Sequence, residues 1–127
     1  MAKTKILVAD DEARMRKLIS DFLTAAGYDV TEAEDGEQAV DLFFGTGGFG
    51  LVILDVMMPL MDGQSAARAI RESGAADARE IPILALTADT YGDIEQRCMS
   101  AGMDGYLRKP IDTDELFRVL VREFDKE

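Results

Sequence analysis

The sequence predicts an α/β fold, with a parallel five-stranded sheet covered by helices on both faces. Short apolar runs alternate with amphipathic helical stretches five times along the chain, which is the pattern of repeated β-α units. The connections between them are short, and such crossovers place helices on both sides of a parallel sheet. No internal repeat or low-complexity tract interrupts the pattern, so we expect residues 1–127 to form a single domain without an output domain.

The first two units are defined by apolar periodicity and by end signals. Residues 6–9 form an apolar strand, and the helix after it ends at Gly27, a residue suited to a left-handed cap. Residues 28–33 are expected to be a second strand. Asp35 and Gln38 then have capping-box spacing for the next helix. The residues expected on the apolar side of the first helix are Met15, Leu18, Ile19, Phe22, Leu23 and Ala26.

The last three units follow the same logic. Residues 51–54 are uniformly apolar, which predicts a central strand covered on both faces, and a helix over residues 64–71 follows. Residues 81–86 and 105–107 are the fourth and fifth strands, and residues 112–115 cap the last helix. The fourth helix is expected to carry Tyr91, Ile94, Cys98 and Ala101 on one side, and the last an inner row of Leu116, Leu120 and Phe124 flanked by Phe117 and Val121.

Composition excludes several kinds of chemistry. The chain has no histidine, which rules out Ser-His-Asp catalysis, imidazole zinc sites and a phosphohistidine on this chain. A net charge of −11 disfavours direct binding to nucleic acid. No segment resembles a signal peptide or a membrane span, so no membrane association is expected. The single cysteine, Cys98, cannot form an internal disulfide, which suits a cytoplasmic protein.

Polar residues follow the predicted strands where each strand ends. Asp10 and Asp11 follow the first strand, Asp55 the third, Thr87 the fourth and Lys109 the fifth. Ligands of open parallel sheets bind beyond the carboxyl ends of the strands, so these side chains are expected on one edge. Carboxylate oxygens suit Mg²⁺, an aspartate can act as a nucleophile toward phosphorus, and an ammonium and a hydroxyl can neutralise phosphoryl oxygens.

Each of these residues alone has a purely structural explanation. An acidic pair after a strand is often a helix N-terminal charge preference, and the two interpretations of Asp10 and Asp11 are about equally weighted. Asp55 alone could be a turn residue, Thr87 a strand end and Lys109 a solvated loop residue. Their common position at strand ends favours a functional site.

The motifs resemble those of the receiver domains of two-component response regulators over essentially the whole chain. They are ILVADDE at residues 6–12, DVMMPLMDG at 55–63, LTA at 86–88 and GYLRKP at 105–110. The resemblance implies a flavodoxin-like (βα)₅ doubly wound fold with strand order 2-1-3-4-5.

The resemblance also implies roles for the individual residues. Asp55 would be the phosphoryl acceptor in a Mg²⁺-dependent reaction. Asp11, Asp55 and the main-chain carbonyl of Met57 would bind Mg²⁺ directly, and Asp10 would act through a coordinated water. Lys109 would reach the phosphoryl oxygens. The domain would be a signalling module and not an enzyme, although it would assist its own phosphorylation and dephosphorylation.

A switch and partners are implied as well. Thr87 would move toward the phosphoryl group and Tyr106 would turn inward behind it, which remodels the face of helix 4, strand 5 and helix 5. The donor would be a sensor histidine kinase or a histidine phosphotransfer protein, and a downstream effector, unidentified from sequence, would read the result. Arg14 and Met15 are candidate docking contacts, whereas Leu18 is expected to pack in the core.

Two other functions are considered. A haloacid dehalogenase-type phosphatase also uses an aspartyl-phosphate and Mg²⁺, but it requires D-x-D after the first strand and a cap region. Here the acidic pair is contiguous and the expected acceptor, Asp55, follows the third strand. A degenerate receiver that only binds proteins is disfavoured because all the family positions carry functional residue types.

Overall fold

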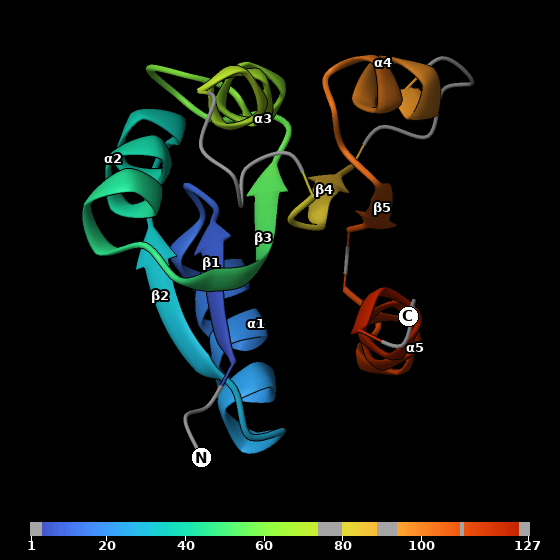
Figure 1. The fold of residues 1–127 in the computed structure, drawn as a ribbon. Helices are drawn as coiled ribbons and strands as arrows, with labels where there is room; N and C mark the ends of the chain where they lie inside the picture. Colours follow the sequence, from blue (N-terminus) through green and yellow to red (C-terminus); the bar gives the residue numbers. More distant parts are fainter. Residues whose placement is uncertain (1–3, 74–79, 89–93, 110, 125–127) are drawn as a thin grey trace.

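Five parallel strands form one sheet in the order β2-β1-β3-β4-β5, as the computed structural model shows (Figure 1). The structure describes residues 4–73, 80–88, 94–109 and 111–124. The strands are β1 Lys5–Ala9, β2 Asp29–Ala33, β3 Phe49–Asp55, β4 Ile83–Thr87 and β5 Gly105–Arg108. The helices are α1 Ala13–Ala25, α2 Gly36–Thr46, α3 Gly63–Glu72, α4 Ile94–Ser100 and α5 Thr113–Phe124.

The predicted fold class and strand order are confirmed, and the boundaries differ by a few residues. β3 extends to Phe49 and Asp55 beyond the four apolar residues that predicted it, whereas β4 begins at Ile83, two residues later than expected. Tyr91 lies outside the described residues. None of the described helices has the length and apolar character needed to cross a membrane.

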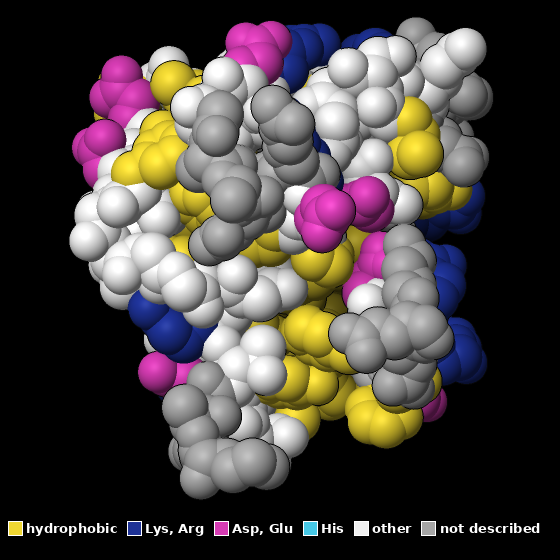
Figure 2. Space-filling model, viewed as in Figure 1, with side chains coloured by type: hydrophobic (Ala, Val, Ile, Leu, Met, Phe, Trp, Pro, Cys, Tyr) yellow, Lys and Arg dark blue, Asp and Glu magenta, His cyan; other side chains and the backbone are white. Residues whose placement is uncertain are grey.

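Charged side chains of both signs are interspersed on the face of the molecule drawn in Figure 2. Acidic side chains occur at the top, the left and the centre of this view, with basic ones between them and along its edge. Acidic side chains on this face are therefore not gathered into a single patch.

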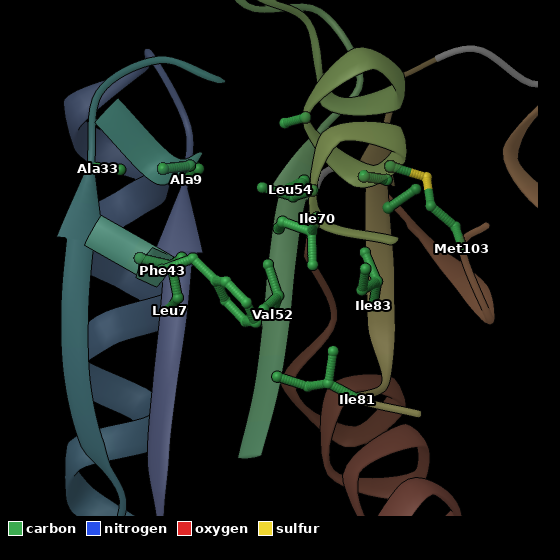
Figure 3. Packing of buried hydrophobic residues seen from close by; sticks show 14 of the residues in the cluster. Leu7, Ala9, Ala33, Phe43, Val52, Leu54, Ile70, Ile81, Ile83 and Met103 are labelled. Carbon is green, nitrogen blue, oxygen red and sulfur yellow. The ribbon is translucent and has the colours of Figure 1, made fainter. Parts of the chain in front are cut away.

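One face of the sheet packs against α2, α3 and α4. Figure 3 shows Phe43 of α2 pointing toward Leu7 and Val52, and Ile70 of α3 lying over the neighbouring strands. Cys98 of α4 belongs to the same cluster and is fully buried, as predicted.

The other face packs against α1 and α5. The helices contribute Ile19 and Leu23 from α1, and Leu116, Val119 and Leu120 from α5. β3 supplies residues to both clusters, Val52 and Leu54 to one and Leu51 and Ile53 to the other. This confirms that β3 is central and covered on both faces.

The prediction that Leu18 packs in the core is wrong, because its side chain is 45% exposed. The buried side of α1 is centred on Ile19 and Leu23 and extends to Ser20. Arg16 lies on that same side, one turn before Ser20, and is itself largely covered. The buried face of α1 is thus rotated away from Leu18, which faces solvent. Met15 is partly buried against the core.

The inner row of α5 is confirmed with one change. Leu116 and Leu120 are buried and Phe124 packs at the edge of the core, where its ring stacks on Tyr28. Val119, which is not part of the predicted row, is also buried. The two flanking residues are both largely exposed, Phe117 and Val121.

The predicted ends of the first two helices are correct. Gly27 follows α1 with a φ of +100°, a backbone conformation in which glycine has no steric penalty. The Asp35 carboxylate accepts a hydrogen bond from the Gln38 N–H at 2.8 Å, and the Gln38 side chain accepts one from the Glu34 N–H. These contacts fix α2 at the edge of the sheet near the carboxyl ends of β1 and β2.

Candidate functional site

Three carboxylates meet beyond the carboxyl ends of β1 and β3. Asp10, Asp11 and Asp55 each present an oxygen, and these oxygens all lie within 4.8 Å of one another. Asp10 is fully buried and Asp55 is only 4% exposed, whereas Asp11 is open to solvent. The three acidic residues singled out by sequence position are therefore brought together, with one side of the cluster open to a ligand.

Backbone contacts position Asp55 at the end of β3. Its Oδ1 accepts a hydrogen bond from the Met57 N–H at 3.2 Å. The next residue, Val56, donates its N–H to the Leu86 carbonyl at 2.9 Å and accepts from the Gly63 N–H at 3.2 Å. The chain after Asp55 is thus tied to both β4 and the start of α3.

Gly63 is required by this close approach. A Cβ at residue 63 would lie 2.9 Å from the carbonyl carbon of Asp55 and closer still to its oxygen. Any side chain there would displace either α3 or the strand end that carries Asp55. The adjacent Asp62 caps α3 by accepting from the Ser65 N–H at 2.7 Å.

Lys109 completes the cluster from the end of β5. Its ammonium Nζ lies 2.8 Å from Asp55 Oδ2 and 3.1 Å from Asp10 Oδ2. The Lys109 N–H donates to the carbonyl of Thr87 at 2.9 Å, which fixes the lysine backbone against the end of β4. One cation thus faces two buried carboxylates, and the side chain of Lys109 is only 16% exposed.

The carboxylates and the ammonium perturb one another. Burial raises the pKa of Asp55 from 3.8 to about 6, and the Asp10 charge acts in the same direction against the lowering effect of Lys109 and the Met57 N–H. Burial alone would lower the pKa of Lys109, but hydrogen bonds and charge from Asp55 and Asp10 outweigh it, so the pKa of Lys109 is raised. A further cation near Asp55 would favour its charged form.

The donor set fits a hard divalent cation. All three groups are carboxylates, and a site with one or two carboxylate ligands and room for water is the arrangement that Mg²⁺ prefers. The negative charge of the three clustered carboxylates exceeds what the single ammonium of Lys109, which contacts Asp10 and Asp55, can neutralise. The exposed side, at Asp11, leaves access for water and for a phosphoryl group.

The remaining predicted residues lie around this cluster. Thr87 is buried at the last position of β4, beside Leu86, which pairs with Asp55 across the ladder. Met57 has an exposed side chain, and its backbone follows Asp55 by two residues. Tyr106 pairs with Ala85 on the β4–β5 ladder and is partly buried. It lines a pocket of about 700 Å³ formed by α4, β5 and α5, outside the acidic cluster.

Two residues that contact the site were not among the predicted site residues. Gly63 is part of a quoted motif, but only the structure shows its contact with the Asp55 carbonyl. Arg16 donates from Nη1 to the Asp10 carbonyl at 2.7 Å. No signal in the sequence distinguishes it from the other basic residues of α1, Arg14 and Lys17, because its partner is a backbone atom.

The comparisons with known proteins agree with this geometry. The family model of the response regulator receiver domain matches residues 6–121. The chain is 36% identical over 124 residues to the hybrid signal transduction histidine kinase I of Dictyostelium discoideum, an alignment that covers 94% of this chain and 7% of that protein. It spans 51% of a probable transcriptional regulator of Porphyridium aerugineum at 38% identity. The chain thus spans about half, or much less, of these relatives.

Two solved structures cover nearly the whole chain. The chemotaxis protein CheY4 of Vibrio cholerae superposes with a TM-score of 0.88 at 34% identity, covering 95% of this chain and 98% of that one. The receiver domain of the sensor histidine kinase PA1611 from Pseudomonas aeruginosa has a TM-score of 0.87 at 36% identity, with coverage of 98% and 100%. That structure has a magnesium ion coordinated in its active-site cleft. From its sequence, its strand order and its acidic cluster, this chain belongs to the response regulator receiver domain family.

Proposed function

We propose that this domain accepts a phosphoryl group on Asp55 and acts as a phosphorelay signalling module. The observation that supports this best is the convergence of Asp10, Asp11 and Asp55 with the Lys109 ammonium, at the edge of the sheet where β1 and β3 end. This arrangement combines a nucleophile, hard-cation ligands and a fixed positive charge in one small site.

The proposed step is an in-line transfer to the Asp55 carboxylate. One carboxylate oxygen of Asp55 attacks phosphorus, and the new O–P bond forms as the P–N bond of a donor phosphohistidine breaks. The imidazole leaves with the electron pair of that bond and takes up a proton. Lys109 pairs with Asp55 Oδ2 and would contact the incoming phosphoryl oxygens, and the Thr87 hydroxyl would donate to one of them.

The residues proposed to hold Mg²⁺ are Asp11 and Asp55, with the Met57 carbonyl, and with Asp10 acting through water. Bound there, Mg²⁺ would neutralise charge on the phosphoryl oxygens in the transition state. The chain itself contributes the placement of these oxygens. Asp10 is oriented by the Glu12 N–H at 2.8 Å, and Asp55 by the Met57 N–H.

The proposed output is a rearrangement around Thr87 and Tyr106. Thr87 ends β4 beside the acidic cluster, and Tyr106 lies on the neighbouring strand where it lines the pocket between α4, β5 and α5. Movement of Thr87 toward a phosphoryl group would open space behind it for Tyr106. The shape of the pocket would then depend on whether Asp55 is phosphorylated, and a partner could bind one shape in preference to the other.

The proposed donor is a sensor histidine kinase or a histidine phosphotransfer protein, because the chain has no histidine of its own. The domain would be a phosphoacceptor and not a turnover enzyme. We place it in the cytoplasm, where the single buried Cys98 would stay reduced. A downstream effector would read the phosphorylation state of Asp55.

Phosphorylation by acetyl phosphate tests the proposal without a partner protein. We expect intact mass to show one added phosphoryl group in the presence of Mg²⁺ and none after chelation of the metal. Asp55→Asn should abolish the addition, whereas Asp41→Asn, at an exposed residue of α2, should leave it unchanged. Labelling that persists in Asp55→Asn would place the acceptor elsewhere. Rapid turnover of a phosphate ester would instead indicate a phosphatase.

A further inference from the structure

Arg16 connects the acidic loop to two other elements. Its Nη1 donates to the Asp10 carbonyl at 2.7 Å and its Nε to Glu32 Oε1 at 2.8 Å, while Nη2 lies 3.9 Å from Glu34 Oε1. The Arg16 side chain is only 14% exposed. A guanidinium with donors in a fixed plane can hold these acceptors at once, and so ties the end of β1 to β2 through α1.

The loop after β1 leads into a helix that lacks a side-chain cap. The β1 ladders end at Ala9, and beyond them the Asp10 N–H donates to the Ala33 carbonyl. Glu12, the N-cap residue of α1, makes no side-chain cap hydrogen bond. In α2 and α3 the N-cap aspartate fixes the first turn, so Arg16 supplies from inside α1 a restraint that the N-cap of α1 lacks.

Asp11 depends on this restraint more than the other acidic residues do. Asp10 and Asp55 are each held by a backbone N–H and by Lys109. Among the described residues, no hydrogen bond or ion pair holds the exposed carboxylate of Asp11. Its position is therefore set by the backbone of residues 10–12, which Arg16 holds at the Asp10 carbonyl.

We infer that Arg16 is a positioning residue for the cation site, which it serves by fixing the backbone that carries Asp10 and Asp11. This inference rests on the proposed Mg²⁺ site and adds a residue to it. Arg16 touches neither the cation nor the phosphoryl group. It acts through the Asp10 carbonyl, and its pairing with Glu32 keeps the guanidinium in place.

An electrostatic role and a positioning role of Arg16 predict opposite changes in Mg²⁺ affinity when Arg16 is removed. Removal of a positive charge from the neighbourhood of three carboxylates strengthens their attraction for a divalent cation. Loss of the hydrogen bond to the Asp10 carbonyl releases the loop and weakens cation binding. Groups that orient metal ligands typically change affinity by 10- to 100-fold when removed. A weaker affinity in an Arg16 variant therefore identifies positioning.

The experiment is a Mg²⁺ titration of isotope-labelled protein, followed through the amide signals of residues 10–12 and 55–57. We expect Arg16→Met to raise the Kd for Mg²⁺ about tenfold. Lys17→Met is the matched control, because it removes one cation from the next position of α1. The Lys17 side chain is 77% exposed, and among the residues that the structure describes it pairs with Asp21 alone. Its Kd should equal that of the wild type or be slightly lower.

Amide hydrogen exchange gives a second readout that needs no metal. Arg16→Met should accelerate exchange at Asp10 and Glu12, whose N–H groups are hydrogen-bonded, while α5 keeps its protection. If Arg16→Met does not fold, Arg16→Lys is used, because lysine keeps the charge but cannot hold Asp10 and Glu32 together, and weaker Mg²⁺ binding is again required. A Kd equal to or below that of the wild type overturns the inference. A wild-type protein that binds no Mg²⁺ would instead overturn the proposed function.

Discussion

Burial and charge act against each other at Asp55. It is 4% exposed, and its pKa is raised from 3.8 to about 6, first by burial and then by the neighbouring Asp10, although Lys109 opposes both. A folded protein that holds an ionised carboxylate in such a place loses stability relative to one with a neutral group. The arrangement suits a carboxylate whose charge a bound cation would compensate.

The raised pKa predicts a pH-dependent effect of Asp55→Asn on stability. The folded state holds the Asp55 proton up to a pH of about 6, whereas the unfolded chain releases it near 3.8. The contribution of Asp55 to stability is therefore full below pH 3.8 and declines as pH rises toward 6. As pH rises through this window, the free energy of unfolding of Asp55→Asn should increase by about 3 kcal/mol relative to that of the wild type. Above the window the difference should stay constant.

Urea unfolding from pH 4 to pH 7.5 in the presence of a chelator measures this difference. The other carboxyl groups are common to both proteins, so their titration largely cancels in the subtraction. A difference between Asp55→Asn and wild type that stays constant over the whole range would contradict the raised pKa.

Lys109 should be more important to stability in the absence of Mg²⁺ than in its presence. Lys109→Met keeps the length of the side chain but leaves Asp10 and Asp55 facing each other without a cation. Loss of one partner of a buried pair costs about 3–5 kcal/mol, and we expect a loss near the lower limit at pH 7.5. Saturating Mg²⁺ should restore more stability to Lys109→Met than to wild type, because the ion replaces the missing charge.

A double-mutant cycle separates this effect from lost packing. In the Asp55→Asn background the cost of Lys109→Met should fall by at least about 1 kcal/mol, because one of the two carboxylates is then neutral. Equal losses in the two backgrounds would show that the lysine stabilises the fold through its alkyl chain alone.

At the scale of elements, the site depends on how the chain leaves each strand. β3 ends in Asp55 and turns into α3 through Gly63, whose missing side chain lets the helix start against the Asp55 carbonyl. α3 and α2 begin with aspartate caps that hold their first turns. α1 lacks such a cap, and the loop before it is held instead by the hydrogen bond from Arg16 to the Asp10 carbonyl.

Two glycine-to-alanine substitutions should have opposite effects. Gly63→Ala introduces a Cβ 2.9 Å from the Asp55 carbonyl carbon, and the required shift should cost about 2–3 kcal/mol and weaken Mg²⁺ binding. Gly45→Ala, within α2, meets no atom within 4 Å and should stabilise the protein by about 0.5–1 kcal/mol. Thermal unfolding of both variants checks the signs. A Gly63→Ala protein as stable as wild type would show that α3 can shift without cost.

Elements whose side-chain pattern reflects burial were predictable from sequence. β3 has no polar residue from Leu51 to Leu54 because both of its faces are covered. The predicted site residues lie at or just after strand ends, and they meet because parallel strands end at one edge of the sheet. The rotation of α1 was not predictable. Leu18 fits the apolar spacing of the helix, but Arg16 takes a covered position because its guanidinium bonds a carbonyl and Glu32. Contacts to backbone atoms leave no such pattern.

At the scale of the whole molecule, the acidic residues are of two kinds: those distributed over the surface and those clustered at one site. The net charge is −11, and on the face seen in Figure 2 charges of both signs are interspersed. The clustered residues are Asp10, Asp11 and Asp55, whose three carboxylates, two of them buried, lie together at one edge of the sheet. The proposed binding of a cation at this cluster would therefore be linked both to the stability of the whole fold and to protonation of Asp55.

This linkage predicts that Mg²⁺ raises the melting temperature in a pH-dependent way. An Mg²⁺ concentration of 100 times the Kd adds about 2.7 kcal/mol, which corresponds to roughly 10 °C for a domain of this size. At pH 5, one unit below the pKa of about 6, Asp55 must release a proton before it can bind the ion, so the affinity for Mg²⁺ should fall about tenfold. At the same Mg²⁺ concentration, the increase in melting temperature should then be about half as large.

Thermal scans at pH 7.5 and pH 5, each with and without Mg²⁺, measure the two shifts. Asp55→Asn should lose most of the shift at both pH values, because one of the three carboxylates is gone. Glu37→Gln, at an exposed residue of α2, has the same change of charge and should keep the wild-type behaviour. Equal Mg²⁺ shifts at pH 5 and pH 7.5 would mean that the ion binds without Asp55, and the raised pKa of Asp55 would then have no part in cation binding.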